Sequence, residues 1–221
     1  MLIVEKEPKS IAAENYRTLR SNIQYSSFDK EYKVIVVTSS DPGEGKTTTA
    51  SNLALCMAQG DKKVILIDCD LRKPSLHKEF RISNLVGLSD VIVGKADLSK
   101  AAHKYNENLV VLPSGKIPPN PSEMLSSKTM SKLLETLKDS FDYIILDTPP
   151  VQAVTDSQIL STKADGTILV VRAEKTKKDS VENTLNLLKK VNANIIGTVF
   201  NGVEASRNKY SYYYEENSLT S

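Results

Sequence analysis

The chain has little of three features that mark other classes of protein. Its 221 residues include only two cysteines, too few for a disulfide framework, which favours the cytoplasm as its compartment. No apolar run approaches the ~20 residues that cross a bilayer, and the first residues show no basic segment followed by a long apolar stretch. We therefore expect neither a membrane span nor a secretory signal. The formal net charge of +2 gives no reason to expect nucleic acid as a partner.

The composition and the apolar pattern favour an α/β protein. Hydrophobic residues make up 40% of the chain and charged residues 25%, which is ordinary for a soluble globular domain. Six short apolar runs are continuous rather than alternating, and this is typical of strands covered on both faces in a parallel sheet. These runs lie at about 33–40, 63–70, 108–115, 142–150, 166–173 and 194–202.

Helical patterns separate the predicted strands. They lie at about 8–26, 46–59, near 76, and at 88–93, 131–139, 157–163 and 178–191, while the proline-rich stretch 113–121 predicts a loop. We expect a doubly wound, mostly parallel sheet with helices on both faces, formed by one domain over residues 1–203. Residues 204–221 have few aliphatic side chains and predict a flexible C-terminal segment, which contains four of the nine tyrosines: Tyr210, Tyr212, Tyr213 and Tyr214.

A glycine-containing loop between the first predicted strand and the next helix predicts a phosphate-binding site. Backbone N–H groups and the helix dipole attract phosphate there, a lysine can reach the outer phosphates, and a threonine can hold Mg²⁺. The strict pattern places glycine first, where this chain has serine. The alternative is an ordinary glycine-containing turn. The candidate nucleotide-binding residues are Ser40, Gly43, Glu44, Gly45, Lys46, Thr47 and Thr48.

Three aspartates follow two of the predicted strands. Asp68 and Asp70 end the run 63–70, and Asp147 directly follows the apolar residues 144–146 of the run 142–150. Carboxyl ends of parallel strands meet at the edge of the sheet where ligands bind, so these side chains should lie beside the loop as Mg²⁺ ligands, direct or through water. Helix capping is the alternative for each one.

These motifs resemble the bacterial P-loop tyrosine kinases of the capsule and exopolysaccharide type, the CapB/CpsD-like kinases, which share the MinD/ParA-like P-loop fold. The resemblance covers nearly the whole chain, and serine at the first loop position is normal in that family. It implies that Lys46 and Thr47 bind ATP with Mg²⁺, and that Asp68, Asp70 and Asp147 serve metal binding and catalysis. It also implies autophosphorylation of the four C-terminal tyrosines.

Further residues have roles only under this resemblance. Glu14, Arg17 and Arg20 match a motif on the first predicted helix that implies assembly into a homo-oligomeric ring, although ion pairs within the helix explain the same spacing. Asn201 ends the sixth strand where the superfamily contacts adenine, and a turn-forming asparagine is the alternative. Arg72 faces either phosphate, a neighbouring chain or solvent.

The resemblance also implies partners and a location. They are the cytoplasmic tail of a transmembrane adaptor that activates the kinase at the inner face of the membrane, a cognate tyrosine phosphatase, and polysaccharide-synthesis enzymes as substrates. Two other functions remain open: a MinD/ParA-like ATPase switch that controls assembly on a surface, and a scaffold that binds nucleotide without turnover. Asp41 counts against the switch, because those ATPases carry a second lysine at this position.

Overall fold

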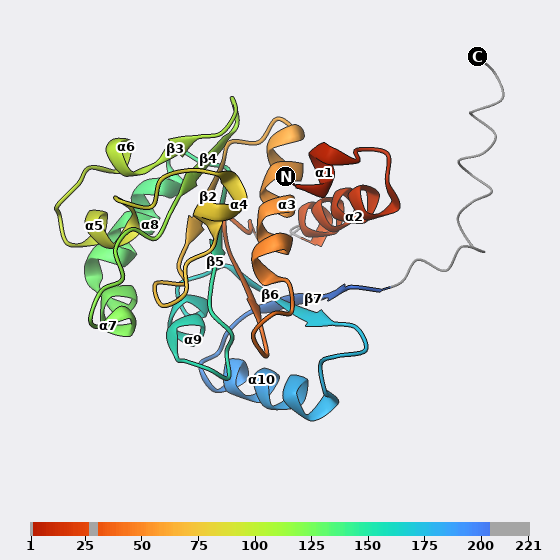
Figure 1. Ribbon diagram of the computed structural model, residues 1–221. Helices are drawn as coiled ribbons and strands as arrows, with labels where there is room; N and C mark the ends of the chain where they lie inside the picture. The colour runs from red at the N-terminus through yellow and green to blue at the C-terminus, as the bar shows by residue number, and fades with distance from the viewer. Residues whose placement is uncertain (1, 27–30, 204–221) are drawn as a thin grey trace, which may run out of the picture.

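A computed structural model describes residues 2–26 and 31–203 and shows a single sheet between two layers of helices (Figure 1). The sheet has the strand order β3-β4-β2-β5-β1-β6-β7, in which every pairing is parallel except that of β3 with β4. The strands are β1 (Val34–Ser39), β2 (Val64–Asp68), β3 (His103–Lys104), β4 (Leu109–Leu112), β5 (Tyr143–Asp147), β6 (Gly166–Arg172) and β7 (Ile195–Asn201). The predicted doubly wound α/β fold is confirmed.

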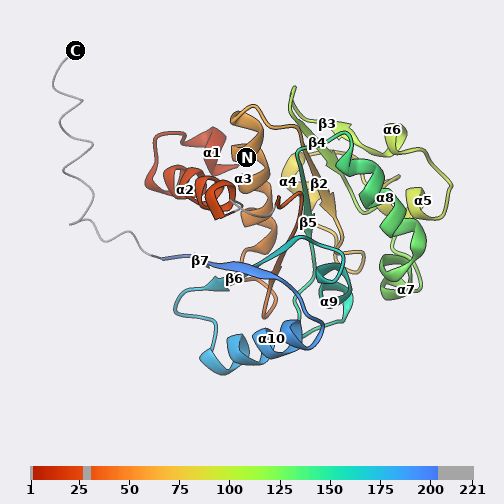
Figure 2. The same ribbon diagram turned by 180° about the vertical axis from the view of Figure 1, so that it is seen from behind.

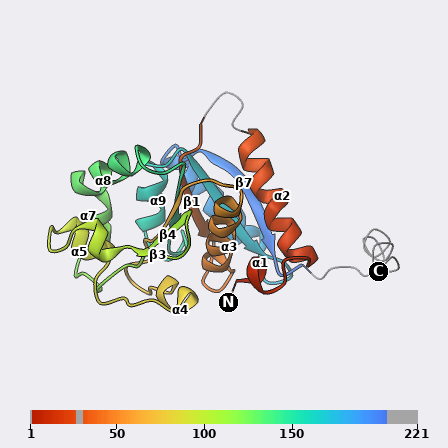
Figure 3. The same ribbon diagram turned by 90° about the horizontal axis from the view of Figure 1, so that it is seen from above.

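The helices lie on both faces of this sheet, as Figure 3 shows from above. One layer holds α1 (Ile3–Lys6), α2 (Ile11–Ser26) and α3 (Lys46–Gln59). The other holds α5 (Leu88–Ile92), α7 (Pro121–Ser126), α8 (Lys128–Lys138) and α9 (Asp156–Ser161). The remaining helices are α4 (Leu76–Phe80), α6 (Leu98–Ala101) and α10 (Lys178–Lys190).

Alternate side chains of β1 explain why the predicted strands are continuous apolar runs. Ile35 and Val37 belong to the core beneath α3, whereas Val34 and Val36 belong to the core beneath α8 and α9. All four are fully buried. Because both faces of the strand are covered, polar residues have no solvent-facing position to occupy. The order of the strands places β1 between β5 and β6, at the centre of the parallel part of the sheet.

Some boundaries differ from the sequence prediction. The first long helix begins at Ile11 rather than at residue 8, because the Ser10 hydroxyl accepts a hydrogen bond from the Ala13 N–H and caps the helix there. The sequence analysis missed α1, α6, α7 and β3, which are six residues or shorter and too brief to show a period. In the described part of the chain no helix combines the length and apolar character that crossing a bilayer requires.

The two ends of the described fold lie near each other. Figure 2 shows α1 and α2 on the same side of the molecule as the end of β7. Strand β7 is an edge strand, and Phe200 on it is 66% exposed. The predicted C-terminal segment 204–221, with its four tyrosines, lies outside the described residues.

Asp165 provides a test of how the amino edge of the sheet is held. Its carboxylate accepts hydrogen bonds from the Lys33 and Val34 N–H groups at 3.1 and 2.7 Å. We expect Asp165→Asn to lower the free energy of unfolding by about 1–2 kcal/mol, because these are charge-assisted hydrogen bonds that start the central strand. Urea unfolding followed by circular dichroism measures the change. The exposed Asp142 accepts a single bond from Lys63 N–H, so Asp142→Asn should cost less, and equal losses would contradict this account.

Candidate active site

The predicted phosphate-binding loop joins β1 to α3 at the carboxyl edge of the sheet. Gly43 and Gly45 have φ angles of +78° and +94°, a left-handed conformation that side-chain-bearing residues rarely adopt. Helix α3 begins at Lys46, so its free N–H groups face the loop and make an anion site. Thr48 is exposed in this first turn, and the Ser40 hydroxyl is buried without a hydrogen-bond partner among the described residues.

Glu44 fixes the loop from the inside. Its carboxylate accepts hydrogen bonds from the Ser40 and Asp41 N–H groups at 2.9 and 3.2 Å, and from the Thr176 hydroxyl. The residue is 2% exposed. Because its side chain is bonded within the protein, Glu44 can contribute to a nucleotide site only through its backbone.

The loop is also clamped from outside by the ends of β6 and β7. Arg172 donates to the Gly43 carbonyl at 3.1 Å, and Asn201 donates to the Glu44 carbonyl at 3.0 Å. A Cβ atom at Gly45 would lie 1.8 Å from the Asn201 amide nitrogen, so glycine is required there. The Asn201 side chain therefore lies against the phosphate-binding loop.

The register of the sheet brings the aspartates to the same edge as the loop. Asp147 on β5 is aligned with Asp68 on β2 and with Val37 on β1, two residues before β1 ends. The Asp70 carboxylate lies 3.6 Å from the Lys46 ammonium group. All three aspartates are at most 4% exposed. The structure thus gathers three buried carboxylates and one lysine where the phosphate-binding loop enters α3.

Asp68 organises the segment that follows β2. Its carboxylate accepts hydrogen bonds from the Asp70 N–H at 3.2 Å and from the Ser75 and Leu76 N–H groups, both at 3.0 Å. The last two bonds cap α4, so the capping role considered as an alternative is met in the structure. Burial raises the pKa of Asp68 to about 6, although these N–H donors oppose the shift.

Asp147 has the least compensated charge in the site. Neither of its carboxylate oxygens has a hydrogen-bond partner among the described residues, and both are buried. Burial raises the pKa of Asp147 to about 7 and the Asp68 charge adds to the shift, whereas the Lys46 charge and the close Thr47 hydroxyl only partly offset it. The Thr47 hydroxyl lies nearby and pairs with the Ser75 hydroxyl at 3.1 Å. Buried, unpartnered carboxylate oxygens are the donors that a hard cation prefers, so the site is suited to Mg²⁺.

The described residues contain no group of three histidine, cysteine, aspartate or glutamate side chains that could hold a metal by themselves. Mg²⁺ usually takes one or two carboxylates and completes its shell with phosphate oxygens and water.

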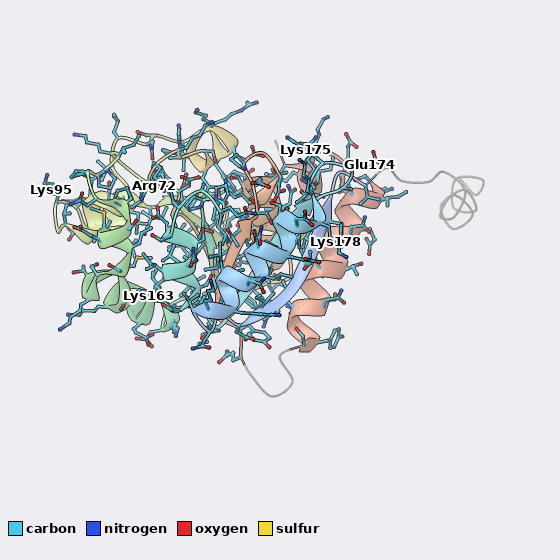
Figure 4. The ribbon with its side chains drawn as sticks, turned by 90° about the horizontal axis from the view of Figure 1, so that it is seen from below. Arg72, Lys95, Lys163, Glu174, Lys175 and Lys178 are labelled. Carbon is cyan, nitrogen blue, oxygen red and sulfur yellow. The ribbon has the colours of Figure 1, made fainter. Side chains whose placement is uncertain are left out.

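Several contacts at this site escaped the sequence analysis. Thr176 and Ser180 hold the loop through Glu44 and Asp41, and Ser75 contacts Thr47. Figure 4, which views this edge, shows Lys175 beside α10. Arg172 ends an apolar strand at the same edge as the loop, so its position in the sequence could have indicated a role at the site. Single serine or threonine residues in polar loops give no such indication.

The Glu14, Arg17 and Arg20 side chains make contacts within the chain. Arg17 pairs with Glu14 at 2.7 Å and donates to the Pro8 carbonyl at 2.6 Å. Arg20 donates to the Cys56 carbonyl in the last turn of α3 at 2.9 Å. The intrahelical pair considered as an alternative is therefore present, and Arg20 also links α2 to α3.

Comparison with known proteins places this site in a family. Residues 32–199 match a family model described as an AAA domain. The chain is 45% identical to the tyrosine-protein kinase YwqD of Bacillus subtilis (strain 168), over 96% of this chain and 90% of that protein. The chain belongs to the bacterial P-loop tyrosine kinases. As a member of this family it is a protein-tyrosine kinase, which transfers phosphate from ATP to tyrosine hydroxyl groups.

Solved structures agree with this assignment. The chimeric protein CapA2B2 superimposes with a TM-score of 0.89 at 38% identity, covering 92% of this chain and 90% of that one. A plasmid partition protein from Borrelia burgdorferi superimposes with a TM-score of 0.63 at 22% identity, covering 85% of this chain and 87% of that one, and shares the fold alone. The predicted MinD/ParA-like P-loop fold is confirmed.

Because the pKa of Asp147 is raised, we predict that the free energy of unfolding of the nucleotide-free protein falls as the pH rises. An aspartate titrates near pH 4 in the unfolded chain but near pH 7 here, so the folded state holds an extra proton between these values, and its stability falls as pH rises through this window. Asp147→Asn removes this cost. We expect it to raise the free energy of unfolding at pH 8 by on the order of 2–4 kcal/mol relative to the wild type, and by little at pH 4.5.

Urea unfolding of both proteins at the two pH values, without Mg²⁺ or nucleotide, measures this difference. A variant that is less stable than the wild type at pH 8 would show that the Asp147 charge is compensated in the free protein.

Proposed function

We propose that this tyrosine kinase phosphorylates its own C-terminal tyrosines, Tyr210, Tyr212, Tyr213 and Tyr214, and thereby regulates capsule or exopolysaccharide synthesis and export. The observation that carries the proposal is the group of buried carboxylates beside Lys46 at the phosphate-binding loop. Such a group suits phosphoryl transfer, in which catalysis consists mostly of positioning and charge neutralisation. The tyrosine-rich segment follows directly after the described fold.

Under this proposal, ATP and Mg²⁺ bind at the loop. The N–H groups of residues 43–47 and the Lys46 ammonium would hold the phosphates, and Thr47 and Asp147 would hold Mg²⁺, directly or through water, with Asp70 as a supporting ligand. Bound Mg²⁺ supplies positive charge that neutralises the phosphate oxygens. The unpartnered oxygens of Asp147 support this assignment. Asn201 would lie beside the nucleotide through its position on Gly45.

Asp68 would orient the tyrosine hydroxyl and accept its proton. A free tyrosine titrates near pH ~10 and a free aspartate near ~3.9, so complete early proton transfer would be uphill by roughly 8 kcal/mol. Burial raises the pKa of Asp68 and lowers this difference. Its Oδ1 atom receives one backbone hydrogen bond, so it retains a lone pair for the phenol. Because early transfer is uphill, the proton would move to Asp68 late, as the bond between the tyrosine oxygen and phosphorus forms.

The proposal includes assembly into a ring and activation by the cytoplasmic tail of a membrane adaptor, which would hold the kinase at the inner face of the membrane. The exposed edge strand β7 beside α2 supports a contact surface here, since Leu19 and Asn22 of α2 line a hollow together with Phe200. Glu14 on α2 is exposed, and Arg17, its ion-pair partner, is partly exposed. A cognate phosphatase and polysaccharide-synthesis enzymes would be further partners, as proposed for the family.

The first test is incubation with ATP and Mg²⁺ followed by intact-mass measurement. The wild type should gain phosphate mass that maps to residues 204–221, and Lys46→Met should gain none, because the phosphates lose their cation. Lys62→Met is the matched control and should behave as the wild type, because Lys62 is exposed and lies beyond the opposite end of α3 from Lys46. An adaptor peptide belongs in a parallel arm.

Release of inorganic phosphate without added protein mass would instead support the ATPase switch, and nucleotide binding alone would support the scaffold. Either result in both arms contradicts the autokinase proposal. The switch has a structural obstacle, because Asp41 replaces its second lysine and accepts a hydrogen bond from Ser180 on α10.

The second test concerns assembly. Each phosphotyrosine adds about −1.5 to −2 charges, so four would add roughly −6 to −8 and repel neighbouring chains in a ring. Replacing the four C-terminal tyrosines with phenylalanine should leave an oligomer that persists in ATP, as measured by light scattering after size-exclusion chromatography. If ATP dissociates this variant as readily as the wild type, phosphorylation of the segment does not drive disassembly.

A further inference from the structure

The segment after β2 and the first turns of α7 and α9 meet at one buried carboxylate outside the nucleotide site. Asp156 is the first residue of α9 and is fully buried. It accepts two hydrogen bonds from the Arg72 guanidinium, Nε to Oδ2 at 2.9 Å and Nη2 to Oδ1 at 3.1 Å. The Ser122 hydroxyl in the first turn of α7 donates to Oδ1 at 2.6 Å and accepts from Arg72 Nη2 at 2.9 Å. Each of the three residues therefore bonds to both of the others.

Arg72 belongs to the segment that carries Asp68 and Asp70. This segment is wound tightly: Asp68 accepts bonds from Asp70 and Leu76, and Asp70 accepts one from the Lys73 N–H at 2.9 Å. These bonds fix the shape of the segment. Two further hydrogen bonds tie it to its neighbours: the Cys69 N–H donates to the Asp147 carbonyl at 2.8 Å, and the Ser75 hydroxyl pairs with that of Thr47. The Arg72 side chain adds the tie to α7 and α9, through Ser122 and Asp156. Figure 4 shows Arg72 well apart from Lys175, on the other side of this edge.

Asp156 is equally tied to the segment that carries Asp147. The next residue, Ser157, donates to the Pro149 carbonyl, which also accepts from Thr38 on β1 at 2.9 Å. Pro149 is two residues after Asp147. The Arg72–Asp156 pair therefore cross-links the loop after β2 to the loop after β5, which are the two loops that bear the aspartates of the site.

We infer that Arg72, Ser122 and Asp156 form a positioning cluster that holds the Asp68–Asp70 segment against Lys46 and Asp147 during phosphoryl transfer. This rests on the proposed function for the roles of those aspartates. The planar guanidinium meets a carboxylate with two parallel bonds, which fixes both distance and orientation, and small displacements of catalytic groups cost large factors in rate. The sequence analysis left phosphate, a neighbouring chain or solvent open for Arg72 and did not single out Ser122 or Asp156, whereas the structure pairs Arg72 with both of them.

The cluster is tested with Arg72→Ala, Asp156→Asn and the double variant, with Asp165→Asn as the matched control. Asp165 is also a hydrogen-bonded aspartate, but it lies at the amino edge of the sheet, far from the site. In single-turnover phosphorylation of residues 204–221, we expect each cluster variant to be about 10- to 100-fold slower than the wild type. The double variant should be no slower than the worse single one, and Asp165→Asn should keep the wild-type rate.

Two further measurements separate positioning from general damage. Binding of ADP in EDTA reports the phosphate-binding loop alone and should stay within about twofold of the wild type in all variants. Hydrogen exchange of the amides of residues 70, 75 and 76 should accelerate in the cluster variants and not in Asp165→Asn. Rates that are unchanged, or that fall equally in the control, overturn the inference, as does unchanged exchange. If the wild type gains no phosphate, the proposed function fails while the exchange result still decides whether the cluster holds the segment.

Discussion

Buried negative charge at the carboxyl edge of the sheet is the constraint around which this kinase is built. The parallel register sets Asp68 and Asp147 on neighbouring strands, and both are removed from water. Lys46 lies against Asp70, yet one lysine cannot balance three carboxylates, and among the described residues Asp147 has only the nearby Thr47 hydroxyl and no well-formed hydrogen bond. Such an arrangement is costly in the free protein. It is reasonable in a protein that recovers this cost when a cation and phosphates bind.

The surrounding polar contacts hold the carboxyl edge in place although the negative charges of its aspartates are not balanced. Glu44 shapes the phosphate-binding loop from inside, and Arg172 and Asn201 clamp it from outside. Asp68 winds the segment after β2, and the Arg72–Asp156 pair ties this segment to the loop after Asp147. These are short polar contacts between loops, whereas the two apolar cores hold the sheet and helices. The apolar cores therefore determine where the carboxyl edge lies, and the polar contacts between loops determine where its charged side chains lie.

The sequence predicted those parts that depend on local pattern. Continuous apolar runs predicted six of the seven strands, and helix α3 spans the predicted residues, because hydrophobic periodicity and glycine breaks are written in adjacent residues. Lys46 and the three aspartates were expected at one edge because a loop and strand ends have fixed places in such a sheet, and the structure brings them together there. The polar partners of these residues were missed. Arg72 and Asp156 are 84 residues apart, and nothing in either neighbourhood indicates the other. The two-residue strand β3 was missed because its pairing with β4 is a tertiary contact.

The account depends on Asp147 as the group whose charge awaits a cation. Isothermal titration calorimetry of ADP binding, with and without Mg²⁺, tests this most directly when the wild type is compared with Asp147→Asn. The account predicts that Mg²⁺ strengthens ADP binding to the wild type and has much less effect on the variant, while both bind ADP similarly in EDTA. An equal effect of Mg²⁺ on both proteins would contradict the assignment of this edge as the metal and phosphate site.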